Sequence, residues 1–155
     1  MDIYRAKKKD CKGITDELWV PFMDYCSKLD DFSSLDVGAK NLFYSHLCDF
    51  VENKNNVVFV AKDSNKFIGF IKITKLSRPP VYAIKTIGEI TDLFVLSEHR
   101  TNGIGRDLVQ KAFDWFKSNE LDLVWLRVHS PNLRGNSFWK KFGFEEYMVE
   151  RIKRL

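Results

Sequence analysis

Two glycines two residues apart, with an arginine three residues before the first, mark the best place for binding chemistry in this 155-residue chain. The pattern is Arg100-x-x-Gly103-x-Gly105, and it follows the apolar run Ile90–Leu96, an expected strand. A helix should begin here, and the unpaired N–H groups and positive dipole end of a helix start attract phosphate oxygens. Glycine lets a diphosphate approach the backbone, and Arg100 and Arg106 can add charge-assisted hydrogen bonds.

Spacing excludes two common nucleotide-binding motifs. A dinucleotide fingerprint, G-x-G-x-x-G, would need a third glycine where the chain has Leu108. A P-loop would need G-K-[ST] after four intervening residues, and that sequence is absent. On its own, the turn would also suit a helix start that needs glycine only for packing, so its meaning depends on the sequence downstream.

The downstream stretch Val128–Phe144 supplies that context. Together the two stretches resemble the GCN5-related N-acetyltransferase (GNAT) family, whose motifs are [R/Q]-x-x-G-x-[G/A] and V-x-x-x-N-x-x-A-x-x-F-Y-x-x-x-G-F. The residues that match the second motif in register are Asn132, Phe138, Gly143 and Phe144. Gly135 replaces the family alanine and Trp139 replaces the family tyrosine. The resemblance covers nearly the whole chain, and its specific part is Ile90–Phe144.

The resemblance implies that acetyl-CoA is the co-substrate and that no metal takes part. The pantetheine arm would lie between the strand that ends at Val95 and the strand expected at Leu123–Val128, which splay apart in this family. A β-bulge near Leu93-Phe94 would free backbone groups for this arm and for the thioester oxyanion. The residues expected to bind the co-substrate are Phe94, Val95, Arg100, Thr101, Asn102, Gly103, Ile104, Gly105, Arg106, Asn132, Phe138 and Trp139.

The implied reaction is direct attack of a primary amine on the thioester in a ternary complex. An amine attacks only as the neutral base, so a carboxylate, or a water chain leading to one, is expected as general base. Glu89 and Asp92 lie on or beside the strand that carries the thioester and are the first candidates, and His129 could relay protons. Either carboxylate could instead be a surface or capping group, and a lone histidine at a strand end could be structural.

Trp139 leaves the general acid open, because an indole N–H is not a practical proton source. Water could protonate the departing thiolate, Tyr147 or another group could substitute, or the protein could bind acyl-CoA without turnover. We favour water, because losing one acid–base group costs about 10²–10⁴ in rate without abolishing substrate positioning. The alternative function is a catalytically silent acyl-CoA sensor or partner-binding module.

These motifs need a scaffold, and the hydrophobic periodicity predicts one mixed α/β domain over residues 1–155. The element order is β-α-α-β-β-β-α-β-α-β, the acyl-CoA N-acyltransferase architecture, with a hairpin early and a βαβ crossover late. The expected strands are 3–9, 56–61, 67–74, 90–96, 123–128 and 144–149. The expected helices are 16–29, one from near Asp36, one from Ile104 and one at 133–142.

The net charge of +4 is unevenly distributed. Asp10–Glu52 holds nine acids and three lysines, whereas Arg100–Leu155 holds eleven bases and seven acids. An acid-rich acceptor side would suit a cationic amine, either a small molecule or a peptide, although solvated helix faces give the same count. Modest charge and the lack of a recognition motif argue against nucleic acid, and the lack of a run of about 18 apolar residues argues against a membrane span.

The three cysteines, Cys11, Cys26 and Cys48, are odd in number and form no C-x-x-C pair. They are typical of reduced thiols rather than of disulfides or a zinc site. The start of the chain has no apolar h-region, so a cytoplasmic location is expected. A homodimer through the C-terminal strand is possible if the edge of that strand is open.

Overall fold

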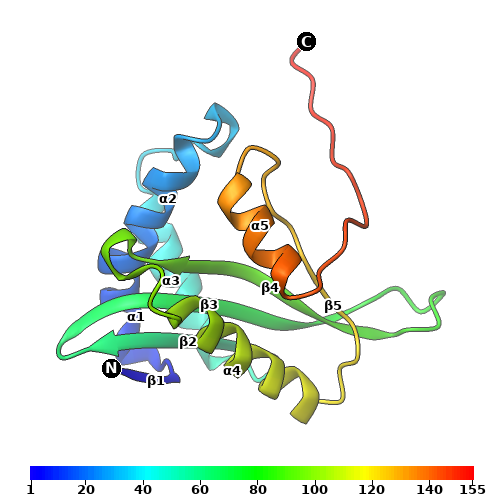
Figure 1. The fold of residues 1–155 in the computed structure, drawn as a ribbon, viewed down its shortest axis with the longest axis horizontal. Coiled ribbons are helices and arrows are strands. Elements are labelled where there is room, and N and C mark those ends of the chain that lie inside the picture. The colour runs from blue at the N-terminus through cyan, green and yellow to red at the C-terminus, as the bar shows by residue number, and fades with distance from the viewer.

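A computed structural model describes residues 1–155 and shows a single five-stranded sheet with helices on both faces (Figure 1). The strand order is β1-β2-β3-β4-β5, so β1 and β5 form the two edges. The strands are β1 (Asp2–Arg5), β2 (Asn56–Asp63), β3 (Lys66–Ser77), β4 (Thr86–Val95) and β5 (Val124–Leu126). Neighbouring strands are antiparallel from β1 to β4, and β5 runs parallel to β4.

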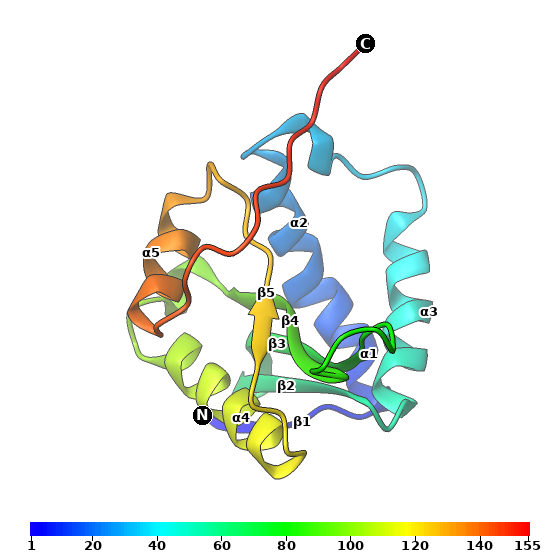
Figure 2. The ribbon, with the colours of Figure 1, turned by 90° about the vertical axis from the view of Figure 1, so that its right-hand side faces the viewer.

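The helices form two layers, which lie on either side of the sheet in Figure 2. They are α1 (Cys11–Gly13), α2 (Val20–Ser27), α3 (Ala39–Glu52), α4 (Ile104–Ser118) and α5 (Leu133–Lys141). A π-helical stretch, Ile14–Trp19, joins α1 to α2. The elements α1 to α3 cover one face of the sheet, and α4 and α5 cover the other. No helix is both long and apolar enough to span a bilayer.

Each layer has its own core because β3 is buried on both sides. Phe70 packs with Leu18 and Leu47 under the N-terminal helices, and the next residue, Ile71, packs with Leu108 under α4. Successive side chains of a strand point to opposite faces, so one apolar run supplies both cores. This double burial makes β3 and β4 the rigid centre from which the site is built.

The expected elements are confirmed as far as α5, with shifted boundaries. The first helical segment begins at Cys11 rather than Asp16, and Pro21 lies in the first turn of α2, where its missing N–H costs least. The strand expected at 3–9 ends at Arg5, and α3 begins at Ala39.

The last expected strand, 144–149, is wrong. Residues 144–155 form no strand and run away from the sheet as an exposed tail (Figure 1). A strand needs a pairing partner, and the free side of the edge strand β5 offers only three residues. Near its end, the tail contacts the rest of the protein through an ion pair, in which a guanidinium nitrogen of Arg154 lies 2.6 Å from Asp31 Oδ2. The strand through which a dimer was expected is therefore not formed.

Candidate active site

The site is built on an edge of β4 that has no strand partner. On the β5 side, β4 pairs at only three positions, the last being Ile90 with Leu126. β4 continues to Val95, whereas the chain leaves β5 and turns toward α5. We call residues 91–95 of β4, on the side facing away from β3, the free edge. The splaying of the two strands expected from the sequence is therefore present.

The backbone groups along the free edge can be assigned from the pairing with β3. The N–H of Leu96 donates to the carbonyl of Ile68 on β3, over 3.0 Å. Since alternate peptides of a strand point to opposite sides, Leu93 and Val95 direct their N–H groups toward the free edge. The carbonyl of Phe94 faces β3, where it would lie 3.1 Å from a Cβ at Gly69. The expectation that Phe94 has free backbone groups is wrong, since they face β3, and the free N–H groups on this edge belong to Leu93 and Val95.

A β-bulge interrupts β4, but it is not at Leu93-Phe94 as expected. Lys72 of β3 faces Asp92 while the next residue, Ile73, faces Ile90, so Thr91 is the extra residue. The displacement has a consequence for chemistry. Residues three apart on a regular strand point to opposite faces, but the bulge restores Glu89 and Asp92 to the same face, the one covered by α1 to α3.

The turn formed by residues 100–106 has the expected open helix start. Gly103 is the N-cap of α4 with a φ of +81°, and no side chain caps the first free N–H groups. Thr101 also has a positive φ, +74°, which is rare for a β-branched residue and typical of ligand-binding turns. A Cβ at Gly105 would lie 3.4 Å from the ring of Phe138, so the first turn of α4 packs against α5.

Arg100 contacts the end of β4 and two aromatic rings beside the turn. Its Nε donates to the carbonyl of Val95 over 2.7 Å, and its guanidinium lies over the rings of Tyr25 and Phe94, at 5.4 and 5.3 Å. Burial and the nearby charge of Arg134 lower the pKa of Arg100. Arg134, in the first turn of α5, was not expected from the sequence, although it follows Asn132 by only two residues. Two like charges held close together favour an anion between them.

Asn132 joins two helices. It is the N-cap of α5, and its Oδ1 accepts hydrogen bonds from the Gly135 N–H at 2.9 Å and from the Tyr25 hydroxyl at 2.8 Å. The second bond links α5 to α2, on the other layer. Tyr25 was not among the residues expected at the co-substrate. The carboxamide oxygen is thus committed within the protein, which leaves the amide nitrogen for any contact with pantetheine.

Replacing Asn132 with alanine should lower the free energy of unfolding by about 1–3 kcal/mol, since a helix cap is worth about 1 kcal/mol and a hydrogen bond about another. Tyr25→Phe keeps the cap and removes only the link to α2, so it should cost about 1 kcal/mol. Urea unfolding of both variants measures the free-energy contributions of the helix cap and of the hydrogen bond to α2. Equal stability of Tyr25→Phe and the parent would show that the interlayer bond contributes nothing.

The candidate base residues are partly buried and paired. Glu89 is 14% exposed, with its Oε1 3.7 Å from Arg127, and Asp92 is 21% exposed. Asp92 Oδ2 lies 3.4 Å from Lys72 Nζ and accepts from the Thr91 hydroxyl at 3.1 Å. Lys72 was missed from the sequence, although a charged residue inside the apolar run 67–74 was an available signal.

The other sequence-predicted residues are distributed unevenly. His129 Nδ1 lies 3.2 Å from Asp30 Oδ2, which places it beside the end of α2. Trp139 is buried at 9% exposure, with Phe138 and Phe144 edge-on to its ring, so it is a core residue of the α4–α5 layer. Tyr147 is 80% exposed on the tail, and the structure does not bring it together with the others.

Comparison with known proteins decides the class. The sequence matches the Acetyltransferase (GNAT) family over residues 14–144. The chain belongs to this family. As a GNAT protein it is an acetyl-CoA-dependent acyltransferase. One curated relative, the uncharacterized N-acetyltransferase YhfO of Bacillus subtilis, is 27% identical over 149 residues, covering 94% of this chain and 91% of the relative.

Solved structures of the GNAT fold agree. A tetramutant of the BH1408 protein from Bacillus halodurans has a TM-score of 0.88 at 21% identity, with 100% of both chains covered. A predicted acetyltransferase from Clostridium acetobutylicum, solved with acetyl-CoA, has a TM-score of 0.77 at 19% identity, over 97% of this chain and 95% of that one. These likenesses establish the fold of the GNAT chain.

The acid-rich first third of the GNAT chain does not form an open acidic surface. Most of its carboxylates have partners within the protein. Asp16 pairs with Lys12 and Lys40, Asp30 with His129, Asp31 with Arg154 and Glu52 with Lys8. Glu17 accepts a hydrogen bond from the Phe67 N–H. The charge count alone therefore does not predict a cationic acceptor. The two carboxylates on the sheet face covered by α1 to α3, Glu89 and Asp92, come from β4 instead.

The reactivity of the Cys26 thiol on α2 is a measurable property of this face of the sheet, because the thiol lies near Asp92 and Asp30. Burial, with the nearby charges of Asp92 and Asp30, raises its pKa to about 11. Only the thiolate reacts with iodoacetamide, so at pH 8 Cys26 should react about 100-fold more slowly than in the unfolded chain, and faster as the pH approaches 11. Asp92→Asn should accelerate the reaction by removing one of the charges. A folded-state rate equal to the unfolded rate would contradict this placement of the thiol.

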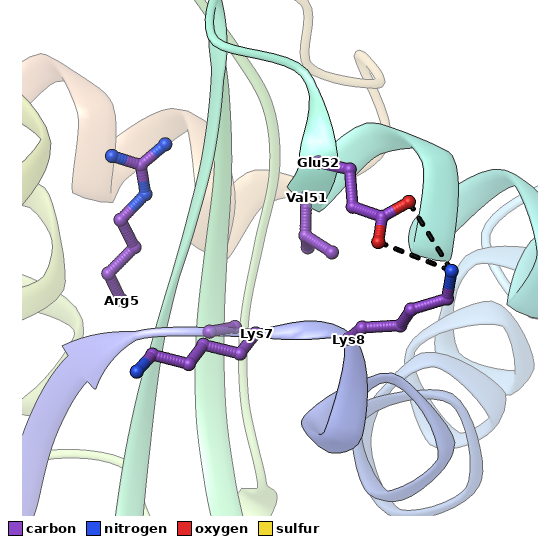
Figure 3. Close-up of a pocket in the computed structure, with 6 residues that line it drawn as sticks. Arg5, Lys7, Lys8, Val51 and Glu52 are labelled. Carbon is purple, nitrogen blue, oxygen red and sulfur yellow. Dashed lines mark hydrogen bonds and ion pairs between the residues drawn. The ribbon is translucent and has the colours of Figure 1, made fainter.

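Two pockets flank the sheet at opposite edges. One, of about 280 Å³, adjoins the turn at residues 100–106 and is lined by Pro21, Asp24, Tyr25, Lys28, Phe94, Leu96, Ser97 and Arg100. The other, of about 320 Å³, lies between the end of β1 and the end of α3, where Lys8 pairs with Glu52 at 3.2 Å (Figure 3). Because β1 is the edge opposite β5, this second pocket is remote from the free edge. No cluster of three or more histidine, cysteine or acidic residues is placed to hold a metal.

Proposed function

We propose that this GNAT protein transfers the acetyl group of acetyl-CoA to a primary amine by direct attack in a ternary complex, within one domain that spans residues 1–155. The observation that carries the proposal is the free edge of β4 leading into the uncapped start of α4. A thioester needs hydrogen-bond donors at the carbonyl oxygen, and a diphosphate needs donors and positive potential. Both kinds of donor lie along one continuous piece of backbone.

The co-substrate fits this backbone from end to end. The diphosphate would rest on the N–H groups of Ile104, Gly105 and Arg106, with Thr101 and Asn102 completing the turn. The pantetheine arm would follow the free edge, where the Val95 N–H is available but its carbonyl is held by Arg100. The Leu93 N–H would meet the thioester oxygen and stabilise the oxyanion. The Asn132 amide nitrogen and the side chain of Phe138 would border the arm from α5.

Asp92 is the general base in this proposal. It directly precedes Leu93, whereas Glu89 is four residues before Leu93, or roughly 10 Å or more along the strand. Asp92 Oδ1 has no hydrogen-bond partner in the protein, so it can take a proton from the amine or from one intervening water. Glu89 and His129 would then carry protons onward, because they lie on the same side of the sheet as Asp92 or beside it.

Water protonates the departing thiolate. Trp139 is packed among aromatic rings, and Tyr147 lies on the exposed tail. Neither residue is positioned to donate a proton to sulfur at the free edge. A thiolate is a good leaving group, so the absence of a protein acid slows the reaction without preventing it.

The acceptor is an amine that approaches from the face covered by α1 to α3. Glu89 and Asp92 on that face would attract an ammonium group, which supports a cationic small molecule or peptide amine. The charge on this face is balanced by Lys72 and Arg127, so a single charged amine suits it better than a polycation. We place this reaction in the cytoplasm.

Isothermal titration with acetyl-CoA, followed by thiol release in the presence of pooled amines, tests the proposal. We expect binding and a rise in free thiol that depends on both substrates. The replacement of the family tyrosine by buried Trp139 favours a second candidate, a silent acyl-CoA sensor. Binding without thiol release from a broad amine pool would support the sensor, and absence of binding would contradict both.

A further inference from the structure

Lys72 is a cation in an unusual place. It lies in the middle of β3, is only 8% exposed, and is the only buried basic residue of the chain. Lysine is almost never buried without a partner, because removing its charge from water is costly. The ammonium group lies 3.4 Å from Asp92 Oδ2 and 4.4 Å from the centre of the Phe50 ring, above it. Phe50 belongs to α3, so the ammonium group lies between the sheet and the N-terminal helices, while Asp92 keeps 21% exposure.

The surroundings of Asp92 make Lys72 its main charged partner. From β4 come Thr91, which donates to it, and Glu89, which shares its face. From α2 comes the neutral thiol of Cys26. The other basic groups on this side pair with other carboxylates. Arg127 forms ion pairs with Glu89 and Glu150, and His129 lies against Asp30.

The two carboxylate oxygens of Asp92 have different surroundings. Lys72 and Thr91 both contact Oδ2, and Oδ1 makes no hydrogen bond within the protein. A carboxylate held by one oxygen has a fixed rotamer, so the direction of the other oxygen is fixed too. The bulge at Thr91 is what brings these three groups together, because it sets Asp92 opposite Lys72.

We propose that Lys72 is a positioning residue for acetyl transfer, which holds Asp92 Oδ2 so that Oδ1 faces the incoming amine. The inference rests on the proposed function and adds a residue that the GNAT motifs do not contain. Lys72 touches neither substrate. A stability role alone would not explain the residue, because apolar replacements of buried ion pairs are often neutral or stabilising.

A double-mutant cycle tests the inference with the full chain, using acetyl-CoA and an amine that the parent protein acetylates. Lys72→Met should lower kcat about 10–100-fold, with KM for the amine and Kd for acetyl-CoA changed less than about threefold. In an Asp92→Asn background the same change should have no further effect on kcat, because Lys72 acts through Asp92. Lys72→Arg should recover part of the loss.

Lys62 provides a matched control. It lies on the neighbouring strand β2, its Nζ is 4.7 Å from the Phe67 ring, and it has no carboxylate partner. Lys62→Met should leave kcat unchanged. Thermal unfolding of every variant identifies loss of fold, and Lys72→Gln repeats the cycle if Lys72→Met does not fold.

The outcomes separate this inference from the proposed function. No thiol release by the parent protein with any amine would overturn the proposed function and this inference with it. Turnover by the parent together with an unchanged kcat in folded Lys72→Met would overturn the inference alone. Losses that multiply in the double variant would also overturn it, because they would show that Lys72 acts independently of Asp92.

Discussion

Asparagine in place of Asp92 should lower kcat by about 10²–10⁴ while the Kd for acetyl-CoA stays within about threefold of the parent value. The amide has the shape of the carboxylate but cannot accept a proton from the attacking amine. The change leaves the backbone of the free edge and the start of α4, where we propose that the co-substrate binds, as they are in the parent protein. Steady-state thiol release measures kcat, and isothermal titration measures the affinity.

Glu89→Gln is the matched control for this prediction. Glu89 shares the face and the strand of Asp92, and it is buried to a similar degree, but it lies beside the paired part of β5 rather than beside Leu93. We expect a loss of less than about tenfold, which fits a residue that relays protons but does not remove the first one. A larger loss in Glu89→Gln than in Asp92→Asn would reverse the assignment and make Glu89 the base.

The sequence was most informative where structure is set by neighbours along the chain. Gly103 can adopt the left-handed φ with which the chain enters α4, and the first N–H groups of α4 are free because no carbonyl of a preceding turn and no capping side chain accepts from them. The contact between Gly105 and Phe138 likewise follows from two motifs that each carry their own local geometry. The open start of α4 and its packing against α5 could therefore be predicted from spacing.

The acceptor half could not, because it depends on strand register. The position of the bulge decides which face Glu89 and Asp92 share, and register is settled by pairing with β3, which no local pattern encodes. Lys72 becomes part of the site through the same pairing. The charge count could not locate the acceptor side for a related reason, since Glu52 and Asp31 find their partners at Lys8 and Arg154, far away in sequence.

The C-terminal tail shows that β-strand propensity alone does not predict a strand. Tyr147-Met148-Val149 is a plausible strand by composition, yet an isolated strand has no hydrogen-bond partner and gains nothing from being extended. The free side of β5 offers only three residues for pairing. The apolar residues of the tail stay exposed, and the composition of a segment does not decide its structure where the partner is short.

Valine in place of Gly103 should weaken acetyl-CoA binding about 10–100-fold. Gly103 has a φ of +81° at the N-cap of α4, and a left-handed backbone costs a β-branched residue roughly 1–2 kcal/mol or more. The turn would relax and turn the first N–H groups of α4 away from the diphosphate. A hydrogen bond to a charged group is worth about 1.5–3 kcal/mol, and about 1.4 kcal/mol corresponds to a tenfold change in Kd. Isothermal titration measures the change.

Gly38 makes a close control, because the chain contains the same local geometry twice. Gly38 is the N-cap of α3 with a φ of +85°, and a Cβ at either glycine would have no atom within 4 Å. Gly38→Val should therefore lower the free energy of unfolding by as much as Gly103→Val does, about 1–2 kcal/mol, and leave Kd for acetyl-CoA unchanged. If both variants lose affinity equally, the loss comes from general destabilisation and the start of α4 has no special role. If only Gly103→Val loses affinity, the helix start is the diphosphate site, since backbone strain of the same size elsewhere in the fold has no effect on binding.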